Sequence, residues 1–124
     1  IHNITGAPAP VGPYSVATEA NGFVFLSGQV GVDPATGDLV DGGVAPETRQ
    51  VMENIGTILG ELGLGYADIV RATIFVTDMR EFATVNAAYA EYVGDAKPAR
   101  STVEVSALPL GVHVEIEVIA QRRS

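Results

Sequence analysis

An arginine at the start of a short alternating segment has the type and setting to bind an anion. Arg100 follows Lys97-Pro98-Ala99, in a chain with only seven lysines and arginines. Pro98 fixes its own φ and restricts Lys97 to extended geometry, so we expect a helix to end and a strand to begin here. An arginine held at such a point presents its planar fork to a carboxylate. The alternative is a surface arginine whose stem lies on apolar neighbours.

The residues after Arg100 alternate in polarity, as a β-strand does. Val103, Val105 and Ala107 fall on one side, and Thr102, Glu104 and Ser106 on the other. Arg100 shares the parity of Thr102, so we expect its side chain on the more polar side of the strand.

Three other polar residues stand out from their surroundings. Glu115 lies in a segment rich in Val and Ile, Asn86 lies on the apolar side of a predicted helix, and Tyr14 follows Gly12-Pro13. Each also has a structural explanation. Glu115 would be a solvent-facing residue of an edge strand, Asn86 a buried amide that binds backbone groups, and Tyr14 a core ring with a bonded hydroxyl.

Several familiar catalytic patterns are missing from the sequence. It has no Gly-x-Ser-x-Gly elbow, phosphate-binding loop or dinucleotide fingerprint. His2 and His113 are too few for a zinc site, and without cysteines there is no disulfide or thiol nucleophile. The aspartates of 33–38 do not have the spacing of a calcium loop. We therefore expect no metal and no organic cofactor.

Composition limits the classes of function that fit. A length of 124 residues suits one domain spanning 1–124. The net charge of −8 disfavours binding to nucleic acid and to anionic membranes. No apolar run approaches the ~18–20 residues of a membrane helix, and no signal peptide is visible. The lack of cysteines fits a reducing compartment, and we expect a cytoplasmic protein.

The remaining pattern predicts a mixed α+β fold. We expect strands at 14–20 and 23–27 joined by the hairpin signal Asn21-Gly22, with 28–32 as an irregular continuation. A helix should begin near Pro46 and end at Gly63, followed by a strand at 69–77. Asp78 and Glu81 resemble a capping box before a second helix. The segment after Arg100 and residues 112–120 complete the sheet.

Two helices cannot cover both faces of such a sheet, so we expect them on one face. The other face would then expose Phe23, Phe25 and Ile119 in a monomer, an apolar patch that soluble monomers avoid. We therefore expect these faces to pack together in a closed ring, a homotrimer.

The chain resembles the reactive intermediate deaminase (Rid) family, formerly described as translation inhibitors or endoribonucleases. The matching segments run in order from about residue 8 to 121: Pro10-Val11-Gly12-Pro13-Tyr14-Ser15, Phe25-Leu26-Ser27-Gly28-Gln29, Asp33-Pro34-x-Thr36-Gly37, Gln50-x-x-x-Asn54, Asp68-Ile69-Val70-x-x-Thr73-x-Phe75-Val76-x-Asp78, Phe82-x-x-Val85-Asn86-x-x-Tyr89, Pro98-Ala99-Arg100-Ser101, Leu108-Pro109 and Glu115-Ile116-Glu117. The resemblance therefore covers nearly the whole chain.

This resemblance implies a chorismate-mutase-like fold, a homotrimer and clefts between neighbouring subunits. It also implies hydrolysis of 2-aminoacrylate and other 2-imino acids to 2-oxo acids and ammonia, without a metal or cofactor. Arg100 matches the position that binds the substrate carboxylate, and Glu115 the acid that positions water and exchanges protons. The other matching positions line the pocket or hold its loops: Tyr14, Ser27, Gly28, Asn86 and Thr102.

Some positions depart from the family pattern. Val16 and Glu47 stand where glutamine is common, Thr102 stands where cysteine is common, and the connection from Tyr89 to Pro98 is short. These departures bear on substrate size and rate. The enzyme interpretation requires that Arg100 is not in bulk solvent and that Glu115 does not lie on the far side of the sheet from it.

Two other functions compete with the deaminase interpretation. The first is a non-catalytic protein that binds 2-oxo acids, or acts as a chaperone, through the same clefts. The second is RNA cleavage, which fits neither the net charge of −8 nor the absence of a histidine pair.

Overall fold

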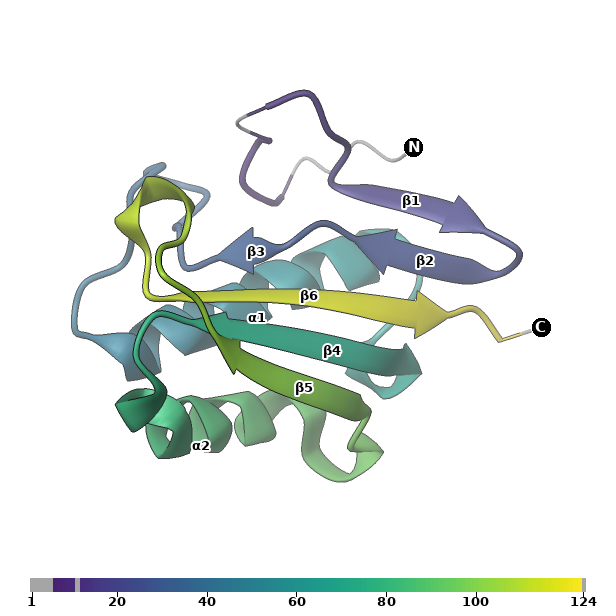
Figure 1. The fold of residues 1–124 in the computed structure, drawn as a ribbon. Coiled ribbons are helices and arrows are strands. Elements are labelled where there is room, and N and C mark those ends of the chain that lie inside the picture. The colour runs from purple at the N-terminus through teal and green to yellow at the C-terminus, as the bar shows by residue number, and fades with distance from the viewer. Residues whose placement is uncertain (1–5, 11, 124) are drawn as a thin grey trace.

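The computed structural model describes residues 6–10 and 12–123 and shows one mixed β-sheet with two α-helices (Figure 1). The strands are β1 (Ala17–Ala20), β2 (Phe23–Leu26), β3 (Gln29–Val30), β4 (Ile69–Val76), β5 (Ala99–Glu104) and β6 (Val114–Gln121). The helices are α1 (Val44–Glu61) and α2 (Phe82–Val93). The predicted α+β class is confirmed, while His2 lies outside the described residues.

The sheet has the order β1-β2-β6-β4-β5, and β3 also pairs with β6. Most pairs are antiparallel, but β4 and β5 are parallel because α2 crosses between their ends. Strand β5 therefore lies at one edge of the sheet. The β1–β2 hairpin turns through Asn21-Gly22 with φ of 54° and 81°, the positive values that the sequence signal predicts.

Both helices lie on one face of the sheet, and α1 packs against β6, β3 and α2 (Figure 1). The core lies between these layers, because the alternate residues of β6 that point toward α1 are buried. The α1 residues that meet them are fully buried and recur at helical spacing: Val51, Met52, Ile55, Ile58 and Leu59. No helix of the described residues covers the other face, where Phe25 keeps 42% of its surface exposed.

The two helices begin differently from the prediction. Helix α1 begins at Val44, after Gly43 with φ of 97°, so Pro46 is its third residue rather than its first. Asp78 does not form a capping box with Glu81. Instead, it caps a single 3-10 turn (Met79–Glu81) by accepting from the Arg80 N–H at 3.0 Å, and α2 begins after that turn. The end of α1 before Gly63, with φ of 75°, is as predicted.

A buried carboxylate fixes the start of β6. Glu47, in the first turn of α1, is 1% exposed and accepts the backbone N–H of His113 at 2.7 Å and that of Val114 at 2.9 Å. Its other oxygen lies 2.8 Å from Nδ1 of His113. These bonds satisfy the carboxylate inside the protein and set the position of Glu115, the next residue of β6.

Candidate active site

Arg100 lies between β5 and α2. It pairs in register with Ala72 of β4, whose side chain is buried on the helix-covered face. Its guanidinium carbon lies 5.3 Å from the centroid of the Tyr89 ring and 5.7 Å from that of the Phe82 ring, both on α2. The more polar side of β5 therefore faces the helix, and Val103 on the other side is 40% exposed. Arg100 is partly buried rather than extended into bulk solvent.

Arg100 differs from the other arginines in its polar contacts. Within residues 6–10 and 12–123, each of the other five arginines has a hydrogen-bond or ion-pair partner: Arg49 with Glu91, Arg71 with Ser101, Arg80 with Asp78, Arg122 with Glu19 and Arg123 with Asp68. Arg100 has only the two ring contacts. Its fork is therefore available for an anionic ligand.

Unsatisfied polar atoms gather on the elements that hold Arg100. Asn86 Oδ1, the Tyr89 hydroxyl and Thr102 Oγ1 are all buried and lack a hydrogen-bond partner among the described residues. Burial raises the pKa of the Tyr89 hydroxyl, while the positive charge of Arg100 opposes this rise. Buried polar groups are normally hydrogen-bonded, so three unsatisfied atoms beside Arg100 are an exception that a functional role would explain.

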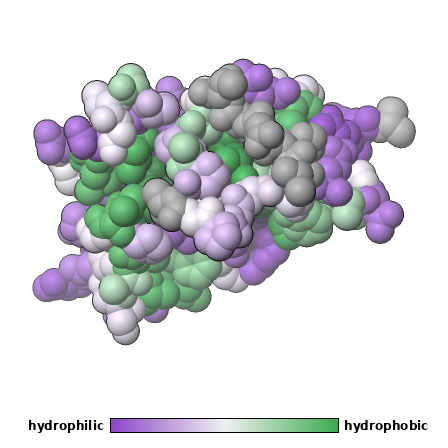
Figure 2. All heavy atoms as spheres, turned by 90° about the horizontal axis from the view of Figure 1, so that it is seen from above, coloured by the Kyte–Doolittle hydropathy of each residue, from purple (hydrophilic) through white to green (hydrophobic). Residues whose placement is uncertain are grey.

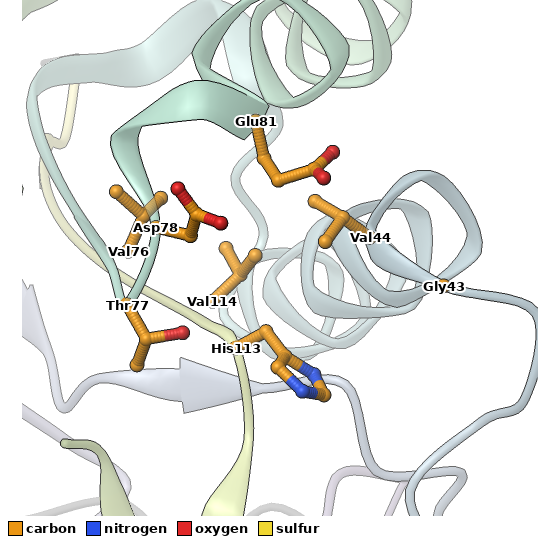
Figure 3. A pocket seen from close by; sticks show the side chains of 8 residues that line it. All are labelled: Gly43, Val44, Val76, Thr77, Asp78, Glu81, His113 and Val114. Carbon is orange, nitrogen blue, oxygen red and sulfur yellow. The ribbon is translucent and has the colours of Figure 1, made fainter.

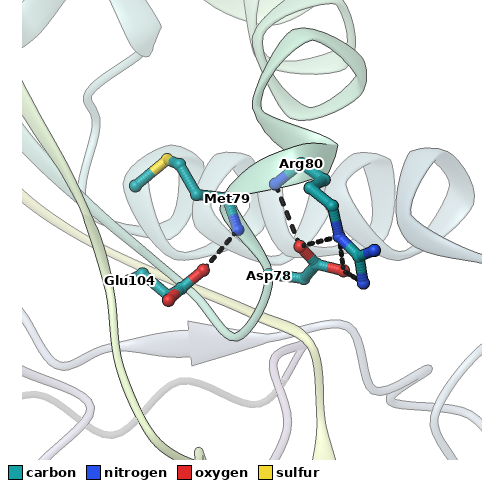
Figure 4. A network of polar contacts seen from close by, with 4 residues as sticks. All are labelled: Asp78, Met79, Arg80 and Glu104. Carbon is teal, nitrogen blue, oxygen red and sulfur yellow. Dashed lines mark hydrogen bonds and ion pairs between the residues drawn. The ribbon is translucent and has the colours of Figure 1, made fainter.

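A small polar network joins the start of α2 to the end of β5 (Figure 4). The Met79 N–H donates to Glu104 Oε1 at 2.7 Å, and Asp78 binds both the backbone and the guanidinium of Arg80. Because Glu104 ends β5, this contact fixes the 3-10 turn before α2 beside the strand that carries Arg100.

Glu115 faces the opposite side of the sheet. It pairs in register with Phe75 of β4 and Val30 of β3, and it lines a cavity of about 830 Å³ together with Tyr14, Ser27 and Gly28. Burial raises the pKa of the Glu115 carboxyl above its usual range, and the negative charge of Glu117 raises it further. A larger fraction of Glu115 is therefore protonated near neutral pH than of an exposed glutamate.

Two neighbours of Glu115 shape its surroundings. Ser27 Oγ donates to the carbonyl of Ser15 at 2.6 Å, which holds the lead-in segment before β1 against the β2–β3 connection. At Gly28, a Cβ atom would lie 2.5 Å from Glu115 Oε2. Position 28 therefore accepts only glycine while Glu115 keeps this rotamer.

The cavity that contains Glu115 is largely apolar. Its wall includes Val32, Pro34, Pro109 and Leu110, and Leu110 is one of the most exposed large apolar residues that the structure describes. Figure 2, viewed from above Figure 1, shows hydrophobic surface on the left, where β3 and the connection 105–112 lie. An apolar wall beside the carboxyl groups of Glu115 and Glu117 suits a small molecule with one polar end.

Arg100 and Glu115 do not share a gap within one chain. The two residues have opposite parity with respect to β4: Arg100 is opposite Ala72, and Glu115 is opposite Phe75. The sheet itself separates them. The expectation that Glu115 would not lie across the sheet from Arg100 is therefore wrong for a single chain, and the requirement set for the enzyme interpretation can be met only between two copies of the chain. Alternation places residues on two sides of a strand but does not say which side another copy would meet.

The predicted residues thus form two groups. Arg100, Asn86 and Thr102 lie between α2 and β5, and Tyr14, Ser27, Gly28 and Glu115 lie around the large cavity. Tyr89 and Phe82 belong to the first group but were not expected there. The spacing that would have found them is present, because Phe82, Asn86 and Tyr89 at i, i+4 and i+7 share one side of a helix.

A smaller cavity of about 260 Å³ lies at the start of α1 (Figure 3). Its lining includes Val44, Asp78, Glu81 and His113. Asp78 already binds Arg80, and His113 binds Glu47. Within the described residues, no three His, Cys, Asp or Glu side chains are placed to hold a metal ion. No helix in the same part of the chain is long and apolar enough to cross a membrane.

Comparison with known proteins places this geometry in a family. The family model described as Endoribonuclease L-PSP matches residues 4–122. A RutC family protein of Pyrococcus horikoshii is 49% identical over 116 residues, which cover 94% of this chain and 92% of that protein. A protein of Bos taurus named 2-iminobutanoate/2-iminopropanoate deaminase is 47% identical over 114 residues, which cover 92% of this chain and 83% of that protein.

Solved structures show the same fold. The crystal structure of RidA from an Antarctic Psychrobacter species superimposes with a TM-score of 0.93 at 38% identity, covering 97% of this chain and 97% of that one. The structure of E. coli TdcF with bound serine gives a TM-score of 0.91 at 37% identity, covering 98% of this chain and 97% of that one. The architecture thus extends over nearly the whole length of each.

Proposed function

The chain belongs to the Endoribonuclease L-PSP family, which includes the Rid and RutC proteins, and from this premise we propose that it is an imine deaminase. It hydrolyses 2-aminoacrylate and related 2-imino acids to 2-oxo acids and ammonia. The relatives named 2-iminobutanoate/2-iminopropanoate deaminase support this choice of substrate. The TdcF structure with bound serine supports a site for a small amino-acid-like molecule.

The observation that carries the proposal is the free fork of Arg100. A 2-imino acid bears a carboxylate next to its C=N carbon, and a guanidinium binds a carboxylate through two parallel hydrogen bonds. Arg100 has no polar partner among the described residues, while Asn86 Oδ1 and Thr102 Oγ1 on the same elements are buried and unsatisfied. Arg100 and the Thr102 hydroxyl can donate to the carboxylate, and Asn86 Oδ1 can accept from an N–H of the imino acid.

Glu115 supplies the proton transfers. Water adds to the imine carbon, the imine nitrogen takes up protons, and the C–N bond breaks to release ammonia and leave the C=O of the 2-oxo acid. A carboxyl group that donates a proton to nitrogen and accepts one from water contributes typically 10²–10⁴-fold to such a step. The raised pKa of Glu115 keeps part of it protonated for the donor role.

The two groups of residues meet only if a second copy of the chain contributes one of them. In the proposed homotrimer, Arg100, Asn86 and Thr102 of one copy face Tyr14, Ser27, Gly28 and Glu115 of its neighbour. Phe25 and Val103, with 42% and 40% of their surface exposed on the uncovered face, provide apolar surface for such contact. Residues 1–124 act as one domain in this arrangement.

A non-catalytic 2-oxo acid binding protein would use the same groups and stays the alternative. It predicts ligand binding by calorimetry without any turnover of an imino acid. The cytoplasmic location, and the absence of nucleic-acid, membrane, metal and cofactor partners, stay predictions.

The test is a coupled assay. A serine/threonine dehydratase generates the imino acid, semicarbazide traps it, and the protein should accelerate formation of pyruvate or 2-oxobutyrate. Arg100→Ala should lower kcat/KM by about 100-fold or more, because it removes the carboxylate contact. Arg49→Ala is the matched control, since Arg49 binds Glu91 on the helix surface. Full activity in Arg100→Ala would refute the proposal.

A further inference from the structure

Two aromatic rings hold the guanidinium of Arg100. Phe82 and Tyr89 are seven residues apart on α2, so their Cα atoms are about 10.5 Å apart along the helix axis. The guanidinium carbon lies 5.7 Å from one ring centroid and 5.3 Å from the other. The guanidinium therefore contacts two rings that lie at either end of the stretch of α2 that also carries Asn86.

The two rings differ in rigidity. Tyr89 is 5% exposed and belongs to the hydrophobic core, whereas Phe82 is 38% exposed at the start of the helix. The Tyr89 ring therefore cannot move without disturbing the core, and it offers a fixed surface. Its hydroxyl has no hydrogen-bond partner among the described residues, so no polar contact explains why tyrosine is needed here.

Among the described residues, Arg100 has no polar contact that would fix its orientation. A free arginine side chain loses rotamer entropy when a ligand orders it. Contact with an aromatic face removes part of that cost beforehand, because the ring attracts the cation and suits its flat shape. A fork oriented in advance binds a carboxylate more tightly than a mobile one.

We propose that Tyr89 is a positioning residue, whose buried ring, aided by Phe82, holds the Arg100 fork ready for the substrate carboxylate. This inference rests on the proposed function for its kinetic consequence, but not for its structural one. The ring is the active part of Tyr89, and the hydroxyl contributes little to the orientation of Arg100.

The structural consequence is tested without substrate, by NMR of the arginine Nε–Hε groups, with Arg100→Lys identifying the Arg100 signal. Ring currents should displace this proton signal in the wild type. Tyr89→Phe should retain the displacement, and Tyr89→Leu should lose most of it. Tyr92→Leu is the matched control, because it also removes a ring from α2, but one that packs against Tyr66. An unchanged Arg100 signal in Tyr89→Leu would overturn the inference.

The kinetic consequence appears in KM rather than in kcat, because the carboxylate is held in the ground state and the transition state alike. Tyr89→Leu should raise KM for the imino acid by about 3- to 30-fold, the range expected from one partly buried cation–π contact. Tyr92→Leu should stay within about 2-fold of the wild type, and Tyr89→Phe should raise KM less than Tyr89→Leu does, because it keeps the ring. A Tyr89→Phe enzyme as impaired as Tyr89→Leu would assign the effect to the hydroxyl and refute the role of the ring.

Two further outcomes keep this inference separate from the proposed function. If Arg100→Ala retains full turnover, the carboxylate role of Arg100 fails, and the NMR displacement alone decides whether Tyr89 positions it. If Arg100→Ala is inactive but KM is unchanged in Tyr89→Leu, only the positioning role fails. Should Tyr89→Leu not remain folded, Phe82→Leu replaces it with a smaller expected rise in KM of about 2- to 5-fold.

Discussion

The region around Arg100 and the region around Glu115 use the same sheet in different ways. Arg100 lies in the layer between β5 and α2, with two rings beside it and three buried polar atoms lacking partners nearby. Glu115 lies on the uncovered face, in a largely apolar cavity whose wall is made of loops and the lead-in segment. One region provides a positive charge and hydrogen-bonding groups, and the other provides an acid and apolar surface.

This contrast shows what each region lacks. The Arg100 region has an anion-binding group but no acid to move protons, while the Glu115 region has the acid but no cation for a carboxylate. The proposed imine hydrolysis needs both regions, and the sheet keeps them apart in one chain. A neighbouring copy that brings the two regions together makes one complete site from two incomplete ones.

The largest expected effect comes from separating the two regions genetically. Arg100→Ala and Glu115→Ala should each lower activity by about 100-fold or more. When the two variants carry different tags, are co-expressed and are purified through both tags, activity should return to about a third of the wild type. In every mixed trimer, one cleft in about three receives both Arg100 and Glu115.

If the mixed trimers are no more active than the single variants, Arg100 and Glu115 of one site do not come from different chains, and the contrast between the two regions fails. Wild-type chains purified through the same two tags provide the reference for full activity.

A smaller loss is expected when Glu115 is displaced without being removed. In Gly28→Ala the new methyl group would lie 2.5 Å from Glu115 Oε2, so the carboxylate must move. We expect kcat/KM to fall by about 10-fold, with a stability change under about 1 kcal/mol because the displaced atom ends a flexible side chain.

Gly60→Ala is the control, since nothing lies within 4 Å of the added Cβ on α1. It should leave kcat/KM unchanged and stabilise the helix by about 0.5–1 kcal/mol. Thermal melts and the coupled assay measure both quantities. Equal activity in Gly28→Ala and the wild type would contradict the role of Glu115.

A comparison of two threonines tests whether the buried Thr102 hydroxyl near Arg100 serves ligand binding or the fold. Thr48 Oγ1 donates to the Val44 carbonyl at 2.8 Å, whereas Thr102 Oγ1 is buried without a partner. Thr48→Val should therefore cost about 1 kcal/mol of unfolding free energy, and Thr102→Val close to zero or a small gain. Only Thr102→Val should weaken the binding of 2-oxobutyrate in calorimetry. The reverse order of stabilities would mean that Thr102 serves the fold.

The smallest effect concerns pH. The pKa of Glu115 is raised in the folded state, so its carboxyl binds a proton more tightly there than in the unfolded chain. As the pH rises through the folded pKa, Glu115 loses this proton and the free energy of unfolding falls. Glu115→Gln should therefore melt at a higher temperature than the wild type at pH 7. The difference should vanish below about pH 4, where both states are protonated. A lower melting temperature at pH 7 would contradict the raised pKa.

Local signals in the sequence predicted most of the fold. Asn21-Gly22 indicated the hairpin because its turn needs positive φ, and Gly63 marked the end of α1 for the same reason. The alternation of β6 matches its burial pattern residue by residue. The predicted start of α1 at Pro46 was two residues late. The helix begins at Val44 because Gly43 ends the preceding loop, and Pro46 is tolerated within the first turn.

The candidate site was predictable by residue type but not by arrangement. Arg100 and Glu115 stand out because each is a charge in an apolar segment. Their separation by the sheet depends on which side of β5 meets α2, and the more polar side does so here. Tyr89 lies in the core, and its contact with Arg100 appears only when α2 and β5 are seen together.

The Glu47 bonds to His113 and Val114 fix the position of Glu115 independently of the shape of the cavity wall. The connection 105–112 contributes Pro109 and Leu110 to the cavity wall, and it ends just before these bonds. Insertions or substitutions there are absorbed upstream of the tether, so Glu115 keeps its place in β6. The cavity rim can thereby change in sequence without moving the Glu115 carboxyl.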